Sequence, residues 1–349
     1  MGVSMTADCS VDAIDNVHPS LRACYHPVCR ETDIPPAGLH RVRLLGEDWV
    51  IARIDGALSA MVDRCAHRFA PLSAGRVVDG AVECPYHGYR YGADGKCVLI
   101  PALGAGSPIP PKACVRVAHD LVVRYGLVWL AIDEPIVPIV EVPEWDDPSF
   151  VVAPLPDQQW HAGAGQMTEN FLDMGHLAFL HAATFGDPDE KTVEPYTVER
   201  DGLGFVCDLT HSAKLLADSS GAEQFEVAQR RSTWWYVAPF ALRLRIEYYA
   251  DDVVLTILFF HQPVDAETTK LYVFDLRNDI ADGRSTIDDA IAFQMAVGAE
   301  DKAMLEQMVP KHTPLDVHAE VHTRADRNTL EMRRVLADFV DAAGARTAG

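Results

Sequence analysis

The 349 residues include 30 Lys and Arg residues against 51 Asp and Glu residues, a formal net charge of -21 at pH 7. Hydrophobic residues make up 48% of the chain and charged residues 23%, which is typical of a globular protein that buries a sizeable core. Nucleic acid and anionic membranes repel such a charge, so we expect neither as a partner. The first ten residues lack the pattern of a signal peptide, and no apolar run is long enough to span a bilayer. We therefore expect a cytoplasmic protein.

The length predicts two domains. Residues 20–135 are expected to be all-β, because short apolar or alternating runs are separated by Gly, Asp and Pro turn signals. Within them, residues 93–95 predict a hairpin turn and the Pro-rich residues 109–112 a loop.

Residues 134–145 have the composition of an extended linker. The second domain, 136–349, is expected to combine helices with long strands, so the predicted fold class is α+β. The helices are expected near 167–182, 286–309 and 326–343, and the strands at 243–250, 253–264 and 270–276.

Two short loops each supply one cysteine and one histidine, namely Cys65-Ala-His67 and, 16 residues later, Cys84-Pro-Tyr-His87. A zinc finger pairs its two cysteines in one loop and its two histidines in another, so this pattern is different. Two thiolates on one iron and two imidazoles on the other hold a [2Fe–2S] cluster whose reduction potential is raised by the neutral imidazoles. The spacing predicts such a cluster on these four residues, and a zinc site is the alternative.

Residues 169–181 read ENFLDMGHLAFLH, and two histidines with a carboxylate indicate mononuclear iron(II). His176 and His181 are five residues apart, which separates them by about 140° around a regular helix. They can share a metal only if a distortion such as a π-bulge intervenes or if one of them lies near a helix end. Asp173, three residues before His176, is predicted to orient its imidazole. The alternative is an ordinary buried helix with two hydrogen-bonded histidines.

A third iron ligand must come from elsewhere, and residues 296–310 offer Glu300 and Asp301. Met304, Leu305 and Met308 follow Asp301 at helical spacing, which predicts Asp301 on an apolar face, where a carboxylate is costly unless it is paired or bound to metal. Glu300 is turned about 100° away and is expected to face solvent. We therefore predict Asp301 as the ligand, with a capping or ion-paired aspartate as the alternative.

The pattern C-x-H…C-x-x-H followed by N-x-x-D-x-x-H-x-x-x-x-H resembles the Rieske-type non-haem iron oxygenases, over roughly residues 20–310. It is most similar to the branch that contains vanillate O-demethylase, dicamba monooxygenase and the caffeine N-demethylases. The matching segments are HPVC at 26–29, RCAHRFAPLSAG at 64–75, CPYHGYRY at 84–91, the 169–181 helix and AEDK at 299–302. One departure is Tyr89, where relatives often have Trp.

The resemblance implies a Rieske [2Fe–2S] domain joined to a helix-grip catalytic domain, in which an antiparallel sheet wraps around a long helix. It also implies that Asp173 bridges His176 to the cluster ligand His87 of a neighbouring subunit in a head-to-tail homotrimer. The implied reaction is hydroxylation or O- or N-demethylation of a small aromatic or heterocyclic compound with O2, and cis-dihydroxylation is the alternative.

No G-x-G-x-x-G motif lies between a strand and a helix, and no plant-type ferredoxin motif occurs. We therefore expect electrons to come from a separate NAD(P)H-dependent reductase, with or without a separate ferredoxin. A Rieske electron-transfer protein without catalysis is a different possible class, which predicts no second iron site and usually a membrane anchor. By strand alternation, Trp234, Tyr236, Phe259 and His261 are candidate substrate-pocket residues.

Overall fold

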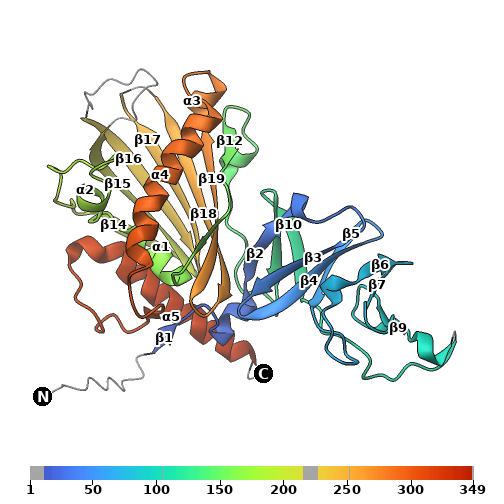
Figure 1. Ribbon diagram of the computed structural model, residues 1–349. Helices are drawn as coiled ribbons and strands as arrows, with labels where there is room; N and C mark the ends of the chain where they lie inside the picture. Colours follow the sequence, from blue (N-terminus) through green and yellow to red (C-terminus); the bar gives the residue numbers. More distant parts are fainter. Residues whose placement is uncertain (1–11, 105, 215–226, 251, 348–349) are drawn as a thin grey trace, which may run out of the picture.

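The computed structural model describes residues 12–104, 106–214, 227–250 and 252–347. The first ten residues, from which we expect no signal peptide, lie outside these ranges. Two groups of antiparallel strands occupy opposite sides of the molecule and share an apolar layer where they meet (Figure 1). No helix in the described ranges is long and apolar enough to cross a lipid bilayer.

The N-terminal group consists of short strands. They are β2 (Tyr25–Arg30), β3 (Leu39–Leu44), β4 (Glu47–Ile54), β5 (Ala57–Val62), β6 (Arg76–Val78), β7 (Ala81–Glu83), β8 (Arg90–Tyr91), β9 (Cys97–Leu99), β10 (Asp120–Arg124) and β11 (Leu127–Ala131). These strands form three small sheets, in the orders β10–β11–β2, β3–β4–β5 and β6–β7–β8–β9. The predicted hairpin turn at 93–95 joins β8 to β9, and the predicted loop at 109–112 contains no strand, so both predictions are confirmed.

The C-terminal group forms one large antiparallel sheet. Its strands are β12 (Val151–Pro154), β13 (Gln158–Trp160), β14 (Thr197–Asp201), β15 (Gly204–Lys214), β16 (Val227–Val237), β17 (Ala241–Tyr248), β18 (Val254–Asp265) and β19 (Thr268–Arg277). Their order is β12–β19–β18–β17–β16–β15–β14, and β13 also pairs with β19. The strands predicted at 243–250, 253–264 and 270–276 correspond to β17, β18 and β19 and are confirmed.

The described α-helices belong to the C-terminal group. They are α1 (Ala164–Leu172), α2 (Leu177–Leu180), α3 (Asn278–Ala281), α4 (Ile287–Leu305) and α5 (Arg327–Thr347). Apolar side chains of α1, α4 and α5 share one core with the sheet, so these helices cover the same sheet face (Figure 1). This confirms the expected α+β fold, in which an antiparallel sheet wraps around a long helix.

The three predicted helices have different outcomes. Those near 286–309 and 326–343 are confirmed as α4 and α5. The one near 167–182 is wrong as a single helix, because the chain forms α1, becomes extended at Asp173 and resumes as the single turn α2.

The segment 134–145 contains no strand or α-helix, as its composition predicts, but it is not a solvated tether. Val137, Ile139, Val140 and Val142 are buried. The last three pack with residues of β11, β18 and β19 in the apolar layer between the two strand groups. Prolines prevent regular structure here while the intervening aliphatic residues still bury apolar surface.

The N-terminal residues before β2 pack on the C-terminal group. The short strands β1 (Ala13–Ile14) and β20 (Thr313–Pro314) pair with each other, and the 3₁₀-helix η1 (Pro19–Ala23) follows. Ile14 and Leu21 belong to the same core as the large sheet. The first described residues thereby close one edge of that core.

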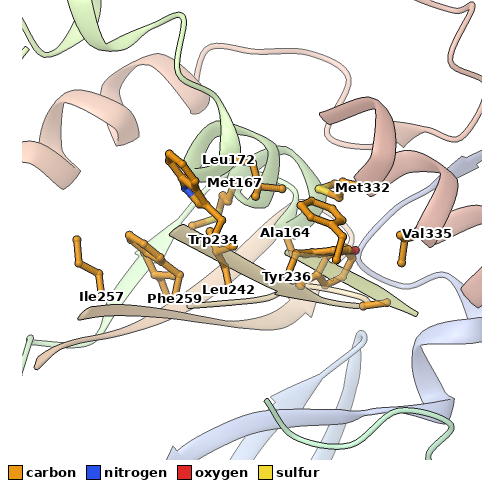
Figure 2. Close-up of a cluster of buried hydrophobic side chains, with 14 of the residues drawn as sticks. Ala164, Met167, Leu172, Trp234, Tyr236, Leu242, Ile257, Phe259, Met332 and Val335 are labelled. Atoms are coloured by element: carbon orange, nitrogen blue, oxygen red, sulfur yellow. The ribbon is translucent and has the colours of Figure 1, made fainter. Parts of the chain in front are cut away.

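Helix α5 is part of this core, although its sequence carries no motif. Met332, Val335, Leu336 and Phe339 are fully buried. Figure 2 shows Met332 and Val335 beside residues of α1 and of strands β16 and β17. The last forty residues therefore cover the sheet and support α1.

Replacing Phe339 with Ala should lower the free energy of unfolding by about 3–5 kcal/mol, because it leaves a cavity where an aromatic ring was fully buried. Guanidinium chloride unfolding followed by circular dichroism measures the change. Asp341→Ala, on an exposed position of the same helix, is the matched control and should stay within about 0.5 kcal/mol of the parent. Equal stability of the two variants would contradict a structural role for α5.

Candidate functional site

The two Cys/His loops have the same backbone arrangement. Cys65 accepts a hydrogen bond at its carbonyl from Phe69 N (3.0 Å) and donates from its own N–H to Ala70 O (2.9 Å). Cys84 does the same with Gly88 N (3.1 Å) and Tyr89 O (2.8 Å).

The fourth residue after each cysteine has a positive φ, 62° at Phe69 and 70° at Gly88. Glycine adopts this conformation freely, whereas phenylalanine is strained in it, and such strain is concentrated at functional sites. The repeated turn aims the two loops at a common point.

The side chains of the loops separate by type. Cys65 and Cys84 are buried, whereas His67 and His87 are exposed, with ring centroids 4.6 Å apart. The hydroxyl of Tyr91 accepts from Ala66 N at 3.1 Å and also lies 3.1 Å from Cys65 Sγ. The four predicted cluster residues are therefore brought together, with sulfur inside and imidazole outside.

Burial raises the pKa of the Cys84 thiol, with a further rise from the neighbouring Cys65. Desolvation and the nearby His87 lower the pKa of His67. A pair of buried thiols beside two imidazoles is the donor set that a histidine-ligated [2Fe–2S] cluster requires, since bound iron supplies the charge that stabilises thiolates. The residues fit that group.

Asp173 places the first candidate iron ligand. Its backbone is extended (φ −75°, ψ 142°) and ends α1. Its carboxylate accepts from Gly175 N (3.0 Å) and His176 N (2.9 Å), and it lies 2.8 Å from His176 Nδ1. Aspartate favours such turns because its side chain satisfies backbone N–H groups outside a helix. Asp173 therefore orients His176, as predicted, but from an extended turn rather than from a helix face.

His176 and His181 flank the single turn α2, one immediately before it and one immediately after. Two histidines five residues apart can share a metal through a π-bulge or through positions at helix ends. This structure places them at the ends of α2 and contains no π-bulge at this point. The imidazole Nε2 atoms lie 3.2 Å apart.

Asp301, in α4, completes the convergence. Its Oδ1 lies 3.1 Å from His181 Nε2 and 3.8 Å from His176 Nε2. The ligand atoms of the three residues all lie within 4.8 Å of one another. Two imidazoles and one carboxylate with open positions are the donor set of mononuclear iron(II) oxygenases, so the residues fit this metal.

Two neighbours that the sequence reasoning missed hold these groups. Asn170 donates to Asp301 Oδ1 at 2.9 Å. Glu300 lies 2.7 Å from His181 Nδ1 and also accepts from Thr184 Oγ1 at 2.9 Å. The expectation that Glu300 faces solvent is therefore wrong. The position of Glu300 next to Asp301 could have indicated this contact, because a residue about 100° around the helix can reach a partner on the flank of the site.

The apolar helix face that was predicted around Asp301 is only partly formed. Asp301 and Leu305 are buried, but Met304 and Met308 are 44% and 40% exposed. Helix α4 ends at Leu305, so Met308 does not continue the stripe. The burial of Asp301 comes from its contact with α1 and not from an apolar helix face.

The carboxylates set the charge state of the site. Burial alone would lower the pKa of His181, but hydrogen bonds and charges of Asp301 and Glu300 outweigh it and raise the pKa. Burial opposes ionisation of Asp173, yet the hydrogen bonds from His176 and Gly175 hold its pKa below the usual range. The site thus favours positive charge between its carboxylates.

The converging atoms open onto a cavity whose space free of protein atoms is about 860 Å³ when the open solvent at its mouth is included. Its walls are mostly apolar and come from the sheet, α1 and α4. Trp234 and Phe259 line it, as predicted; Tyr236 and His261 do not. Tyr236 donates its hydroxyl proton to Pro239 O, and His261 contacts Phe240 O, so both are structural residues farther along the strands.

The two centres are far apart within one chain. The cluster loops follow β5 and β7 at the outer tip of the N-terminal strand group, whereas α1 and α2 lie on the opposite side of the molecule (Figure 1). The structure therefore does not bring His87 and Asp173 of the same chain together.

Two family models match the chain. The model of the Rieske [2Fe-2S] domain covers residues 24–119, and the model of the vanillate O-demethylase oxygenase C-terminal domain covers residues 160–342. The cluster loops lie within the first range, and the three converging residues lie within the second.

Whole-chain relatives agree with these models. Methylxanthine N1-demethylase NdmA of Pseudomonas putida is 34% identical, over 94% of this chain and 92% of its own. The structure of NdmA from Pseudomonas putida CBB5 with caffeine superposes with a TM-score of 0.82, 31% identity and coverage of 95% and 94% of the two chains. Dicamba monooxygenase bound to dicamba has the same fold, at a TM-score of 0.75, 18% identity and coverage of 93% and 99%. The chain therefore belongs to the Rieske-type non-haem iron oxygenases, in the vanillate O-demethylase branch.

Proposed function

We propose that this chain is the terminal oxygenase of a multicomponent monooxygenase that hydroxylates, or removes a methyl group from oxygen or nitrogen of, a small aromatic or heterocyclic substrate. The observation that carries the proposal is the convergence of His176, His181 and Asp301 on the wall of a mostly apolar cavity. O2 is the co-substrate, and a separate NAD(P)H-dependent reductase, with or without a ferredoxin, is the electron donor.

In this proposal residues 20–135 carry the cluster and residues 136–349 carry the iron. Cys65, His67, Cys84 and His87 hold the [2Fe–2S] cluster, and His176, His181 and Asp301 hold Fe(II). When bound, the cluster delivers single electrons and the iron supplies the open positions at which O2 is activated.

The protein residues supply orientation and a dry environment. Asp173 and Glu300 hold the Nδ1 atoms of His176 and His181, so that both Nε2 atoms face each other and Asp301. Asn170 holds Asp301 by one oxygen. Aromatic residues on the sheet side, among them Trp234 and Phe259, exclude water from the space where the substrate methyl group would lie.

We also propose that the working unit is a cytoplasmic homotrimer in which Asp173 connects His176 to His87 of the partner subunit. The surface beside Asp173 supports this. A second cavity there is lined by Asp173 and His176 together with the exposed side chains of Phe179, Met304 and Val321. Apolar exposure of this kind indicates a contact surface.

The cluster tip carries complementary exposed groups, since Phe69 is 62% exposed and Tyr86 is 63% exposed beside the two histidines. In a head-to-tail assembly, the aromatic tip of one copy can contact the apolar hollow beside Asp173 of the next copy.

The reaction class is tested by oxygen uptake with a surrogate reductase and a panel of methoxy- and N-methyl-substituted aromatic compounds. We expect formaldehyde in proportion to the O2 consumed with at least one compound. Diol products without formaldehyde from any methylated compound would show a dihydroxylating enzyme instead.

Replacing Asp301 with Ala should remove the mononuclear iron, because a two-histidine site loses both a coordinate bond and a compensating charge. The parent protein should contain iron in excess of acid-labile sulfide, and in the variant the two should be equal. Glu300→Gln on the adjacent position of α4 is the matched control and should keep the excess. If Asp301→Ala retains the excess while Glu300→Gln loses it, the ligand is Glu300.

Replacing Asp173 with Asn should lower single-turnover product yield by about 10–100-fold, the usual cost of losing a partner of a metal-ligating histidine. The cluster should still be reduced by the reductase and the iron content should remain measurable. Normal product yield would mean that electrons do not pass through Asp173.

A mixed assembly separates a route between subunits from a route within one. Cys84→Ser should lack the cluster and Asp301→Ala should lack the iron, so each alone should be inactive. Co-expressed and purified through two different tags, the mixed oligomer should regain activity, because the cluster of one copy serves the iron of another. No activity in a mixed oligomer with both metals present would contradict the proposed assembly.

A further inference from the structure

One buried charge in the cavity has no counter-ion among the described residues. Arg230, in β16, is 4% exposed and lines the same cavity as His176, His181 and Asp301. No carboxylate of the described residues lies within ion-pair distance of its guanidinium. Buried arginines are normally paired, because taking an isolated charge out of water is costly. The other buried arginines of this sheet, Arg243 and Arg277, each face a glutamate or an aspartate.

The guanidinium uses only part of its hydrogen-bonding capacity. Its Nε donates to His211 Nε2 at 3.3 Å and its Nη1 donates to Tyr248 OH at 3.1 Å. Arginine has five N–H donors, so three remain without a partner among the described residues. Both partners are neutral groups and neither offers a compensating negative charge.

The surroundings hold the guanidinium in place and leave it charged. His211 Nδ1 lies 3.2 Å from Ser212 O and so carries the ring proton, which leaves Nε2 to accept from Arg230. Burial, with the nearby charge of Arg230, lowers the pKa of His211 to about 3, so this imidazole stays neutral. The rings of Phe185 and Tyr248 lie 5.1 Å and 5.7 Å from the guanidinium carbon. Such contacts restrain the plane of the group.

Arg230 lies close to the three converging residues. Phe185 stacks on His181 with ring centroids 4.9 Å apart, and Arg230 lies 5.1 Å from the same Phe185 ring. The guanidinium carbon is therefore at most about 10 Å from the His181 ring. Arg230 and the three converging residues border the same cavity, so one bound ligand can contact both.

The adjacent acidic residues do not neutralise Arg230. Asp187, Glu190 and Glu194 line a neighbouring cavity that Arg230 also borders, but none of them forms an ion pair with it in the described structure. The carboxylates of the main cavity, Asp173 and Asp301, are engaged with histidines. The described residues therefore supply no counter-ion to Arg230, and a bound ligand can supply one.

We propose that Arg230 anchors the substrate by an anionic group, a carboxylate or sulfonate, and that the substrates of this enzyme are aromatic anions. A planar oxyanion accepts two parallel N–H bonds from a guanidinium, which supplies both charge and orientation. This inference rests on the proposed function for the identity of the site, but it concerns binding and can be tested without turnover.

The experiment is calorimetric titration with 4-methoxybenzoate, 4-methoxybenzenesulfonate, their neutral analogue 4-methoxybenzamide, and caffeine. The parent should bind at least one anion about 100-fold more tightly than the amide, a preference of the size lost when one partner of a buried charge pair is truncated. The tighter of the two anions identifies the preferred group. Equal affinities for the anions and the amide, or tighter binding of caffeine, would overturn the proposal.

Three variants assign the preference to Arg230. Arg230→Met should abolish the preference while retaining affinity for the amide, which shows that the cavity is still folded. Arg230→Lys should keep part of the preference, because it keeps the charge without the planar fork. Arg231→Met removes the same charge from the next, exposed residue of β16, whose partner is Asp208, and should change nothing. An equal loss of preference in Arg230→Met and Arg231→Met, or none in Arg230→Met, would contradict the assignment.

The Arg230 anchor and the monooxygenase reaction can be rejected independently of each other. An Arg230-dependent preference for anions, with no formaldehyde or hydroxylated product from any bound compound, would uphold the anchor and reject the monooxygenase. Formaldehyde release from neutral methylated compounds, with no anion preference, would uphold the monooxygenase and reject the anchor.

Discussion

The geometry of the candidate iron site depends on the hydrogen bonds of the Asp173 carboxylate. It accepts from Gly175 N and His176 N and contacts His176 Nδ1, so one side chain both ends α1 and aims an imidazole. In an uninterrupted helix His176 and His181 would point about 140° apart. With the break, a single turn separates them and their Nε2 atoms lie 3.2 Å apart.

The opposite side of the site is held by contacts that connect it to the rest of the core. Asn170 of α1 fixes Asp301 of α4. The preceding residue, Glu169, pairs with the buried Arg333 of α5. Burial raises the pKa of Glu169 and Arg333 opposes this rise. The C-terminal helix thus stabilises the helix from which the site is built, and this gives it a role that its own sequence does not indicate.

Charge is distributed unevenly between the surface and the interior of this acidic protein. The chain as a whole carries a formal charge of -21, yet the sheet wall of its cavity presents an arginine without a carboxylate partner in the described structure. The acidic groups at the other end of the cavity are engaged with the histidines. Polar groups of opposite charge at separate points of a mostly apolar cavity orient a ligand, because the ligand must pair with both.

The sequence alone determined the parts of this protein that depend on local spacing. The Cys65–His67 and Cys84–His87 loops, strands β17, β18 and β19 of the large sheet and helices α4 and α5 could be predicted because turn residues, periodicity and short-range ligand spacing act within a few residues. The break in residues 167–182 could not be predicted, since a capping aspartate competes with a strong helical pattern and the outcome depends on the residues that surround it. Two further contacts between distant segments were also beyond the sequence. Glu300 reaches His181, and Arg230 is left unpaired among His211, Tyr248 and Phe185, only because the sheet and the helices bring these segments side by side. Spacing along the chain sets which side chains share a loop or a face, but burial and charge pairing are properties of the packed molecule, so the tertiary structure alone decided them.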